Sequence, residues 1–160
     1  MSEIEIRIRN ADEKDIPGII ELWTEHLDYH AKCDPFFERT EGAVTGFQEY
    51  LIENLVNIGL FIAENDIRIV GFILLEIAKR PPCFVHRNYG MISDIAVTNE
   101  FRHKKIGQQL LEYSLSWFKQ RDINRIEAHI LDANPLATAF WRSTGFKSYM
   151  NCAYLQIPSE

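Results

Sequence analysis

Cysteine, basic residues and long apolar runs are all scarce in this sequence, and each shortage argues against a class of protein. The three cysteines are far apart and form no CxxC or Cys/His ligand pattern, which indicates neither a disulfide framework nor a zinc site. Lys and Arg number 17 against 23 Asp and Glu, for a net charge of −6, so general affinity for nucleic acid or an anionic membrane is not expected. No apolar run approaches the ~20 residues of a membrane span, and the start is too charged for a signal peptide. We therefore expect a soluble cytoplasmic protein without a nucleic-acid or membrane partner.

The length and the hydrophobic content of the sequence are sufficient for one compact domain over residues 1–160. It is 46% hydrophobic and 25% charged, and a chain of this length can bury a sizeable core. It shows no internal repeat, linker or low-complexity segment. The sequence therefore predicts a single domain.

The first quarter of the chain has the pattern of a strand followed by a helix. Isoleucine alternates with charged residues over 4–8, which is the period of a half-buried strand. Asp12 and Asp15 then precede apolar residues at helical spacing, and Pro17 is tolerated because it lies in the first turn. This helix is expected to end near Cys33.

A second helix and three strands are expected in the middle of the chain. Residues 42–56 have helical character, and the stretch 60–77 predicts two strands joined by a turn at Asn65-Asp66. The next strand, "YGMISDIAV" over 89–97, is almost continuously apolar, which favours a central position buried on both faces.

The last third predicts a strand-helix-strand unit and then a short helix. Apolar residues over 106–118 form a helical stripe, and "RIEAHIL" over 125–131 has strand character. Asn134-Pro135 predicts the start of a helix that ends near Gly145, and the tail 146–157 predicts a final pair of strands. The elements together predict an α/β fold.

A basic cluster lies between the strand that ends at Val97 and the next helix. It consists of Arg102, His103, Lys104 and Lys105, and Gly107 follows within the first helical turn. Free backbone N–H groups and the positive end of the helix dipole meet at such a point, so an anion can bind there. The alternative is a solvated helix start. Phosphate is the anion that best fits this much charge.

Two motifs in the right order resemble the GCN5-related N-acetyltransferase (GNAT) family. Arg102 to Gly107 is similar to the family's Arg/Gln-x-x-Gly-x-Gly/Ala, and "NPLATAFWRSTGF" over 134–146 is similar to its Asn-x-x-Ala-x-x-Phe-Tyr-x-x-x-Gly-Phe. The opening stretch also resembles the family's start. The resemblance implies the GNAT acyl-CoA N-acyltransferase fold, with a mixed six- to seven-stranded sheet flanked by about four helices.

The resemblance also implies a binding site for acetyl-CoA as acetyl donor. Main-chain groups of Ile95, Ala96 and Val97 would pair with the peptide-like pantetheine arm, because a strand edge suits such a ligand. The pyrophosphate would contact the basic turn and the helix start, which comprise Arg102, His103, Lys104, Lys105, Ile106, Gly107 and Gln108. Asn134, Ala137 and Phe140 would flank the pantetheine and the thioester.

The sequence departs from the family pattern at two positions. Lys105 stands where the family prefers its first glycine, which restricts the turn but can add a phosphate contact. Trp141 stands where many members have a tyrosine thought to protonate the departing thiolate, and an indole N–H is no useful acid at neutral pH. The expected reaction therefore has no assigned general acid.

Acetyl transfer to a primary amine, by direct attack in a ternary complex and without a metal, is the reaction that the resemblance implies. Asp94 and Glu76 are the candidate bases, although a structural carboxylate is an open alternative for each. Tyr149 is a candidate replacement for the missing tyrosine, against simple aromatic packing. The acceptor is a small-molecule or protein amine, for which Glu25 and Tyr29 are candidate contacts.

Four further hypotheses accompany this reaction. A non-catalytic acyl-CoA-binding sensor or adaptor is the main alternative, because of Trp141 and the undetermined base. A phosphate-binding protein with a similar turn is the other, and the motif at 134–146 argues against it. A homodimer is plausible if the exposed final strands pair across a two-fold axis. His26 and His30, four apart on one helix face, have the spacing of a metal or acceptor site, with a solvated face as the alternative.

Overall fold

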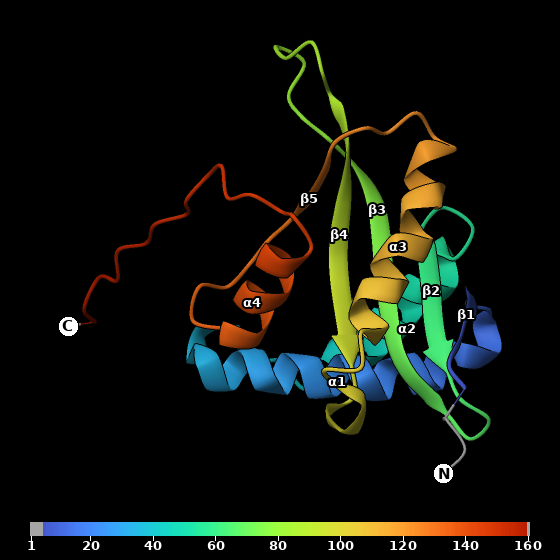
Figure 1. The fold of residues 1–160 in the computed structure, drawn as a ribbon. Helices are drawn as coiled ribbons and strands as arrows, with labels where there is room; N and C mark the ends of the chain where they lie inside the picture. Colours follow the sequence, from blue (N-terminus) through green and yellow to red (C-terminus); the bar gives the residue numbers. More distant parts are fainter. Residues whose placement is uncertain (1–4, 160) are drawn as a thin grey trace. The chain divides into compact units, whose positions relative to one another are not determined.

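The structure is a computed structural model that describes residues 5–159. Contacts divide the chain into two compact units, Met1–His129 and Ile130–Glu160. The first unit contains the sheet and three of the helices, and the second contains one helix and the C-terminal tail (Figure 1). The single domain over residues 1–160 stays a prediction.

The first unit is built on one mixed sheet with the strand order β1-β2-β3-β4-β5. Its strands are β1 (Arg7–Asn10), β2 (Gly59–Glu64), β3 (Ile69–Lys79), β4 (Asn88–Val97) and β5 (Ile126–Ala128). Strands β1 to β4 pair antiparallel in succession, and β5 pairs parallel with β4. The mixed character is confirmed, while residues 5–159 hold five strands and not the six or seven expected. Residue 4 of the predicted first strand lies outside the described residues.

Three helices cover the two faces of this sheet, α3 on one and α1 and α2 on the other (Figure 1). They are α1 (Ile16–Cys33), α2 (Ala43–Asn54) and α3 (Ile106–Lys119). A capping box of Asp12 and Asp15 precedes α1, and Pro17 lies in its first turn, as predicted. The Arg9 guanidinium binds Asp15 at 2.7 Å and Glu64 at 2.8 Å, so it joins β1 to the start of α1 and the end of β2.

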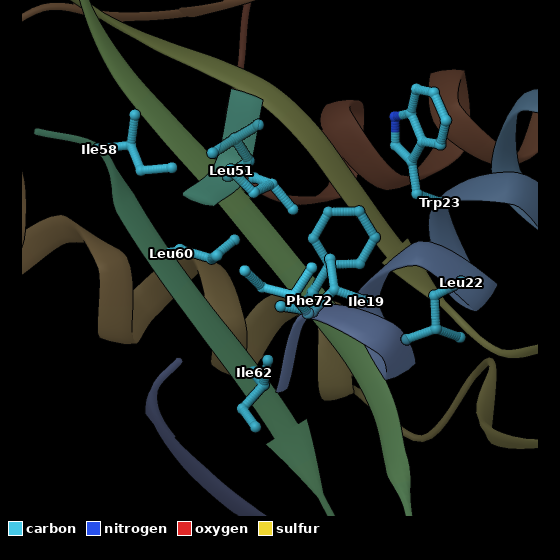
Figure 2. Packing of buried hydrophobic residues seen from close by; sticks show 10 residues of the cluster. Ile19, Leu22, Trp23, Leu51, Ile58, Leu60, Ile62 and Phe72 are labelled. Atoms are coloured by element: carbon cyan, nitrogen blue, oxygen red, sulfur yellow. The ribbon is translucent and has the colours of Figure 1, made fainter. Parts of the chain in front are cut away.

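The core between the sheet and helices α1 and α2 follows from the alternation of side chains along the strands. Leu60 and Ile62 of β2 and Phe72 of β3 face the same side, where they meet Ile19 of α1 and Leu51 of α2 (Figure 2). The intervening residues face α3, and Phe61 packs edge-on against Tyr113 at 5.3 Å. Within residues 5–159 no helix is long and apolar enough to cross a bilayer.

The central, doubly buried strand is β3 and not β4, which corrects the expectation for 89–97. Strand β3 has six consecutive buried residues, whereas most of β4 is partly exposed. Strand β4 is more exposed because β5, its neighbour on the side away from β3, is short and pairs only with Gly90–Ile92. The second half of β4 is therefore left as an edge of the sheet.

The second unit contains α4 (Pro135–Ser143) followed by an irregular tail. Asn134 caps this helix, and Gly145 follows it at φ 88°, both as predicted. The predicted pair of strands in the tail is wrong, because residues 146–159 form no strand. Alternating apolar residues define a face, but a strand also needs a partner edge. The homodimer stays a prediction and loses the strands on which it was based.

Candidate active site

Two alternate residues at the end of β4 direct their backbone groups away from β3. The Thr98 N–H donates to the Val70 carbonyl at 2.9 Å, which makes Thr98 and Val70 a hydrogen-bonded pair of the β3–β4 ladder. By antiparallel alternation Ala96 also bonds to β3, while the N–H and C=O groups of Ile95 and Val97 point to the other edge. No strand of the described chain pairs with that part of the edge. Ile95 and Val97 therefore direct their backbone groups to the free edge, and Ala96 directs its own to β3. Contacts of all three residues with the coenzyme stay predictions.

The start of α3 supplies a second set of free amides. The Gln109 N–H is the first to donate back into the helix, to Lys105 O at 3.0 Å, so the amides of Ile106, Gly107 and Gln108 project from the helix end. Lys105, the N-cap residue, contributes no side-chain cap in the described chain, and the first turn has no acidic residue. The helix end is thus a positive site that its own side chains leave open.

Lys105 has left-handed backbone geometry, with φ 62°, and His103 has φ 61°. This conformation explains why glycine is favoured at the position of Lys105. Lys105→Gly is expected to change the free energy of unfolding by less than about 1 kcal/mol, since the relief of strain is offset by the entropy of the unfolded glycine. Lys105→Val is expected to be about 1–2 kcal/mol less stable than Lys105→Gly, because a β-branched side chain is strained at positive φ.

Urea denaturation followed by circular dichroism checks this prediction. The matched control is Lys104→Val, at a neighbouring exposed lysine that is not among the left-handed residues of the described chain. If Lys105→Val and Lys104→Val are equally stable, the left-handed backbone at Lys105 is wrong.

Arg102 connects the basic turn to the end of β4 and to α1. Its Nε donates to Val97 O at 3.2 Å, and its Nη2 lies 3.4 Å from Glu25 Oε1. The guanidinium also lies 5.8 Å from the centre of the Tyr29 ring. Glu25 and Tyr29 thus contact this arginine. The positive charge of Arg102 offsets the negative charge of Glu25, which was expected to attract the ammonium group of an acceptor. Arg102, Glu25 and Tyr29 form one connected group, and the phosphate contact of Arg102 stays a prediction.

An irregularity in β4 brings polar side chains to the sheet face covered by α1 and α2. Leu74 pairs with Asp94 and Leu75 pairs with Ile92, so Ser93 is an extra residue and forms a β-bulge. The Asp94 side chain shares the face of its partner Leu74, which belongs to the core beneath α1 and α2. The Ser93 hydroxyl donates to Glu76 of β3. The bulge therefore turns two consecutive polar side chains toward one site.

Asp94 lies in a largely buried, weakly polar environment. Its side chain is 18% exposed, and its Oδ1 lies 3.9 Å from His26 Nε2. Burial, followed by the charge of Glu76, raises the pKa of the Asp94 carboxyl to about 7. Burial, followed by the charges of His30 and Arg102, lowers the pKa of His26 to about 4. His26 is therefore neutral near pH 7, and its contact with Asp94 is not an ion pair.

Glu76 differs from Asp94 because both of its carboxylate oxygens accept hydrogen bonds. The Tyr50 hydroxyl of α2 donates to Oε1, and the Ser93 hydroxyl donates to Oε2. Tyr50 was not among the predicted site residues, and His26 was considered only as part of a metal or acceptor site with His30. The aromatic spacing of Phe47 and Tyr50 in α2 was visible in the sequence, but their contact with β3 depends on the packing of α2.

The predicted site residues of the second unit lie on or beside α4. Asn134 Oδ1 accepts the Ala137 N–H at 3.0 Å, as an N-cap. Trp141 packs edge-on against Phe140 at 5.0 Å and Phe146 at 4.6 Å. Contacts of Asn134, Ala137 and Phe140 with coenzyme stay predictions, and so does the role of Tyr149.

The histidine pair of α1 does not extend to a metal site in the described residues. The rings of His26 and His30 lie 4.3 Å apart, and no group of three or more His, Cys, Asp or Glu side chains in residues 5–159 is arranged to hold a metal ion. The expectation of a reaction without a metal stays a prediction.

Comparison with known proteins identifies the family. The profile of the acetyltransferase (GNAT) family matches residues 20–146, which is most of the chain, and the protein belongs to this family. An uncharacterized N-acetyltransferase of Archaeoglobus fulgidus is 26% identical over 138 residues, which cover 86% of this chain and 90% of the relative.

Solved structures share the fold. A mutant form of a Bacillus halodurans protein superposes with a TM-score of 0.83 at 22% identity, covering 95% of this chain and 99% of its own. A predicted acetyltransferase of Clostridium acetobutylicum, solved with acetyl-CoA, superposes with a TM-score of 0.78 at 19% identity, covering 95% and 96%. The predicted GNAT fold is confirmed.

Proposed function

We propose that this protein transfers the acetyl group of acetyl-CoA to a primary amine by direct attack in a ternary complex. One observation carries the proposal. The free edge of β4 at Ile95 and Val97 is followed along the chain by the open amides at the start of α3. Asp94 lies in the sequence between the β-bulge at Ser93 and this edge. One continuous segment, residues 93–108, therefore contains the groups proposed to bind the diphosphate, to pair with the pantetheine arm and to accept the proton of the amine.

The chain fits a coenzyme that has a diphosphate at one end and an amide-containing arm at the other. The amides of Ile106, Gly107 and Gln108 would bind the diphosphate, since a helix N-terminus favours anions. The outward N–H and C=O groups of Ile95 and Val97 would bind the arm as an added strand. Arg102 would release Val97 O to permit this pairing. When bound, the coenzyme supplies an activated thioester.

Asp94 is the residue best placed to accept the proton of the amine. An ammonium with a pKa of about 10.4 faces a transfer that is roughly 9 kcal/mol uphill to a carboxylate of pKa 3.8, but only roughly 5 kcal/mol uphill to one of about 7. Burial of Asp94 therefore removes close to half of this barrier. The free N–H groups of β4 would polarise the thioester carbonyl as the amine attacks.

Departure of the thiolate does not require the missing tyrosine. A thiol of pKa about 8.5 is a tolerable leaving group, so a general acid assists and is not essential. Trp141, held between Phe140 and Phe146, serves α4 as a packing residue.

A non-catalytic acyl-CoA sensor is the second candidate, and Trp141 is the observation that favours it. Both candidates predict coenzyme binding, but only the enzyme predicts release of free thiol that depends on an amine. A thiol-release assay with acetyl-CoA and a panel of polyamines, amino acids, aminoglycosides and lysine peptides distinguishes them.

The acetylated amine is identified by mass spectrometry in the same assay, and the intact protein is weighed after incubation with acetyl-CoA alone. Amine-dependent thiol release with an unmodified protein supports direct transfer. Coenzyme binding without turnover of any amine supports the sensor, and an acetylated protein that then transfers its acetyl group to the amine rules out direct attack.

A further inference from the structure

Glu76 is held by hydroxyl groups from two different parts of the first unit. Tyr50 reaches it from α2, and Ser93 reaches it from the β-bulge in β4. Each hydroxyl donates to a different oxygen of the carboxylate, so the Glu76 side chain is held at both of its oxygens. Ser93 is also the extra residue of the β-bulge and directly precedes Asp94.

We propose that Tyr50 and Ser93 are positioning residues that hold the Glu76 carboxylate beside Asp94, so that Asp94, and not Glu76, exchanges the proton of the amine. This proposal rests on the proposed function, because it assigns the roles of the two carboxyl groups in the same reaction. In a simple packing role, the hydroxyls of Tyr50 and Ser93 would not affect the protonation of Asp94. The proposal states that they do affect it.

The surroundings of Asp94 support this division of roles. His26 faces it from α1, Glu76 acts on it from β3, and Tyr50 lies on the α2 side. Burial, followed by the charges of His30 and Arg102, lowers the pKa of His26 and keeps it neutral near pH 7, so Glu76 supplies the charge that raises the pKa of Asp94. A neighbouring negative charge in a low-dielectric site favours the protonated form of a carboxyl group, so Asp94 holds its proton to higher pH than an isolated aspartate.

Tyr50 remains a donor throughout the relevant pH range. Burial, followed by its hydrogen bond to Glu76, raises the pKa of the Tyr50 phenol well above its usual value. The ring is stacked at one end of an aromatic series, with Phe47 at 6.2 Å and Trp23 a further 4.1 Å from Phe47. Tyr50→Phe keeps this stack and removes only the hydroxyl.

The test is the pH dependence of kcat with a saturating amine in Tyr50→Phe, Ser93→Ala and Glu76→Gln. We expect the acidic limb of the pH profile, near pH 7 in the wild type, to move to lower pH by about half a pH unit to one pH unit in each variant. The charge next to Asp94 is removed in Glu76→Gln, and it is no longer held in place in the two hydroxyl variants. The plateau is expected to fall about 3- to 10-fold, because a less basic carboxylate is a poorer proton acceptor. Ser93→Thr, which keeps a hydroxyl, is expected to restore the wild-type limb.

A second measurement makes the proposal independent of turnover. The carboxyl carbon of Asp94 is followed by NMR in protein labelled at aspartate, with Asp94→Asn used to assign the signal. A midpoint that moves to lower pH in Tyr50→Phe and Glu76→Gln supports the proposal. If both the NMR midpoint and the kinetic limb stay at the wild-type pH, the proposal is wrong. If the midpoint moves but no amine is acetylated by the wild type, the proposed function fails while the electrostatic arrangement stands.

Discussion

Asp94→Asn is expected to lower kcat near pH 7.5 by about 10²- to 10⁴-fold, which is the usual contribution of a positioned base. The amide has nearly the same shape as the carboxylate but cannot accept the amine proton. Asp94 faces neutral His26, and burial keeps its pKa about 7, so the substitution removes a proton acceptor without breaking an ion pair. Steady-state kinetics at saturating acetyl-CoA measure the loss.

The pH dependence of kcat is expected to differ between the wild type and Asp94→Asn. In the wild type, kcat should rise with pH as Asp94 loses its proton and level off above about pH 7. In Asp94→Asn the rate should follow the fraction of free amine and continue to rise toward the amine pKa of about 10.4. The gap between the two proteins should therefore close as the pH rises. A gap that is constant with pH would assign Asp94 a structural role.

A stability measurement and a control variant complete the test. Between pH 3.8 and about 7 the folded protein holds a proton on Asp94 that the unfolded chain has lost, so the contribution of Asp94 to the free energy of unfolding falls as the pH rises. The difference between wild type and Asp94→Asn should shift by roughly 3–4 kcal/mol across this window. Asp66→Asn, in the exposed turn between β2 and β3, should show neither the kinetic nor the stability effect.

Helices and hairpins were predictable because their signals are local. The Asp12 and Asp15 caps, the helix spacing up to Cys33 and the Asn65-Asp66 turn each lie within a few residues of the feature they define. The turn at Lys105 was also predictable, because its charge and the following Gly107 mark a helix start that can bind an anion.

The register of the strands and the contacts between distant residues were not predictable from the sequence. The corrections for β4 and for the tail follow from this. The bulge at Ser93 depends on how β4 aligns with β3, and no residue of β4 alone reveals it. The contact of Arg102 with Glu25 joins residues 77 positions apart. The apolar alternation of the tail was interpreted as strands without a known partner, and the apolar run of β4 as full burial without knowing that β5 is short. The free edge of β4, on which the proposed coenzyme pairing depends, was thus expected only from the family resemblance.

Gly107→Glu is expected to weaken binding of acetyl-CoA by about 10²-fold or more. Gly107 is the second residue of α3, and its amide is one of the three that project from the helix end. A carboxylate there would stand beside the diphosphate, and like charges in contact cost several kcal/mol. Calorimetric titration measures the affinity. Gly107→Gln separates the charge from the added bulk, and Gly46→Glu is the matched control, since a side chain at this exposed position of α2 meets no atom within 4 Å.

A truncated donor makes this test specific for the phosphate. S-acetylpantetheine keeps the arm that would pair with Ile95 and Val97 but lacks the diphosphate, so its affinity should be nearly the same in wild type and Gly107→Glu. Such a result would assign the penalty to the contact between the helix end and the diphosphate. An equal penalty for acetyl-CoA and S-acetylpantetheine would instead mean that the substitution disturbs α3 or the edge of β4. An unchanged affinity for acetyl-CoA would place its diphosphate away from the start of α3.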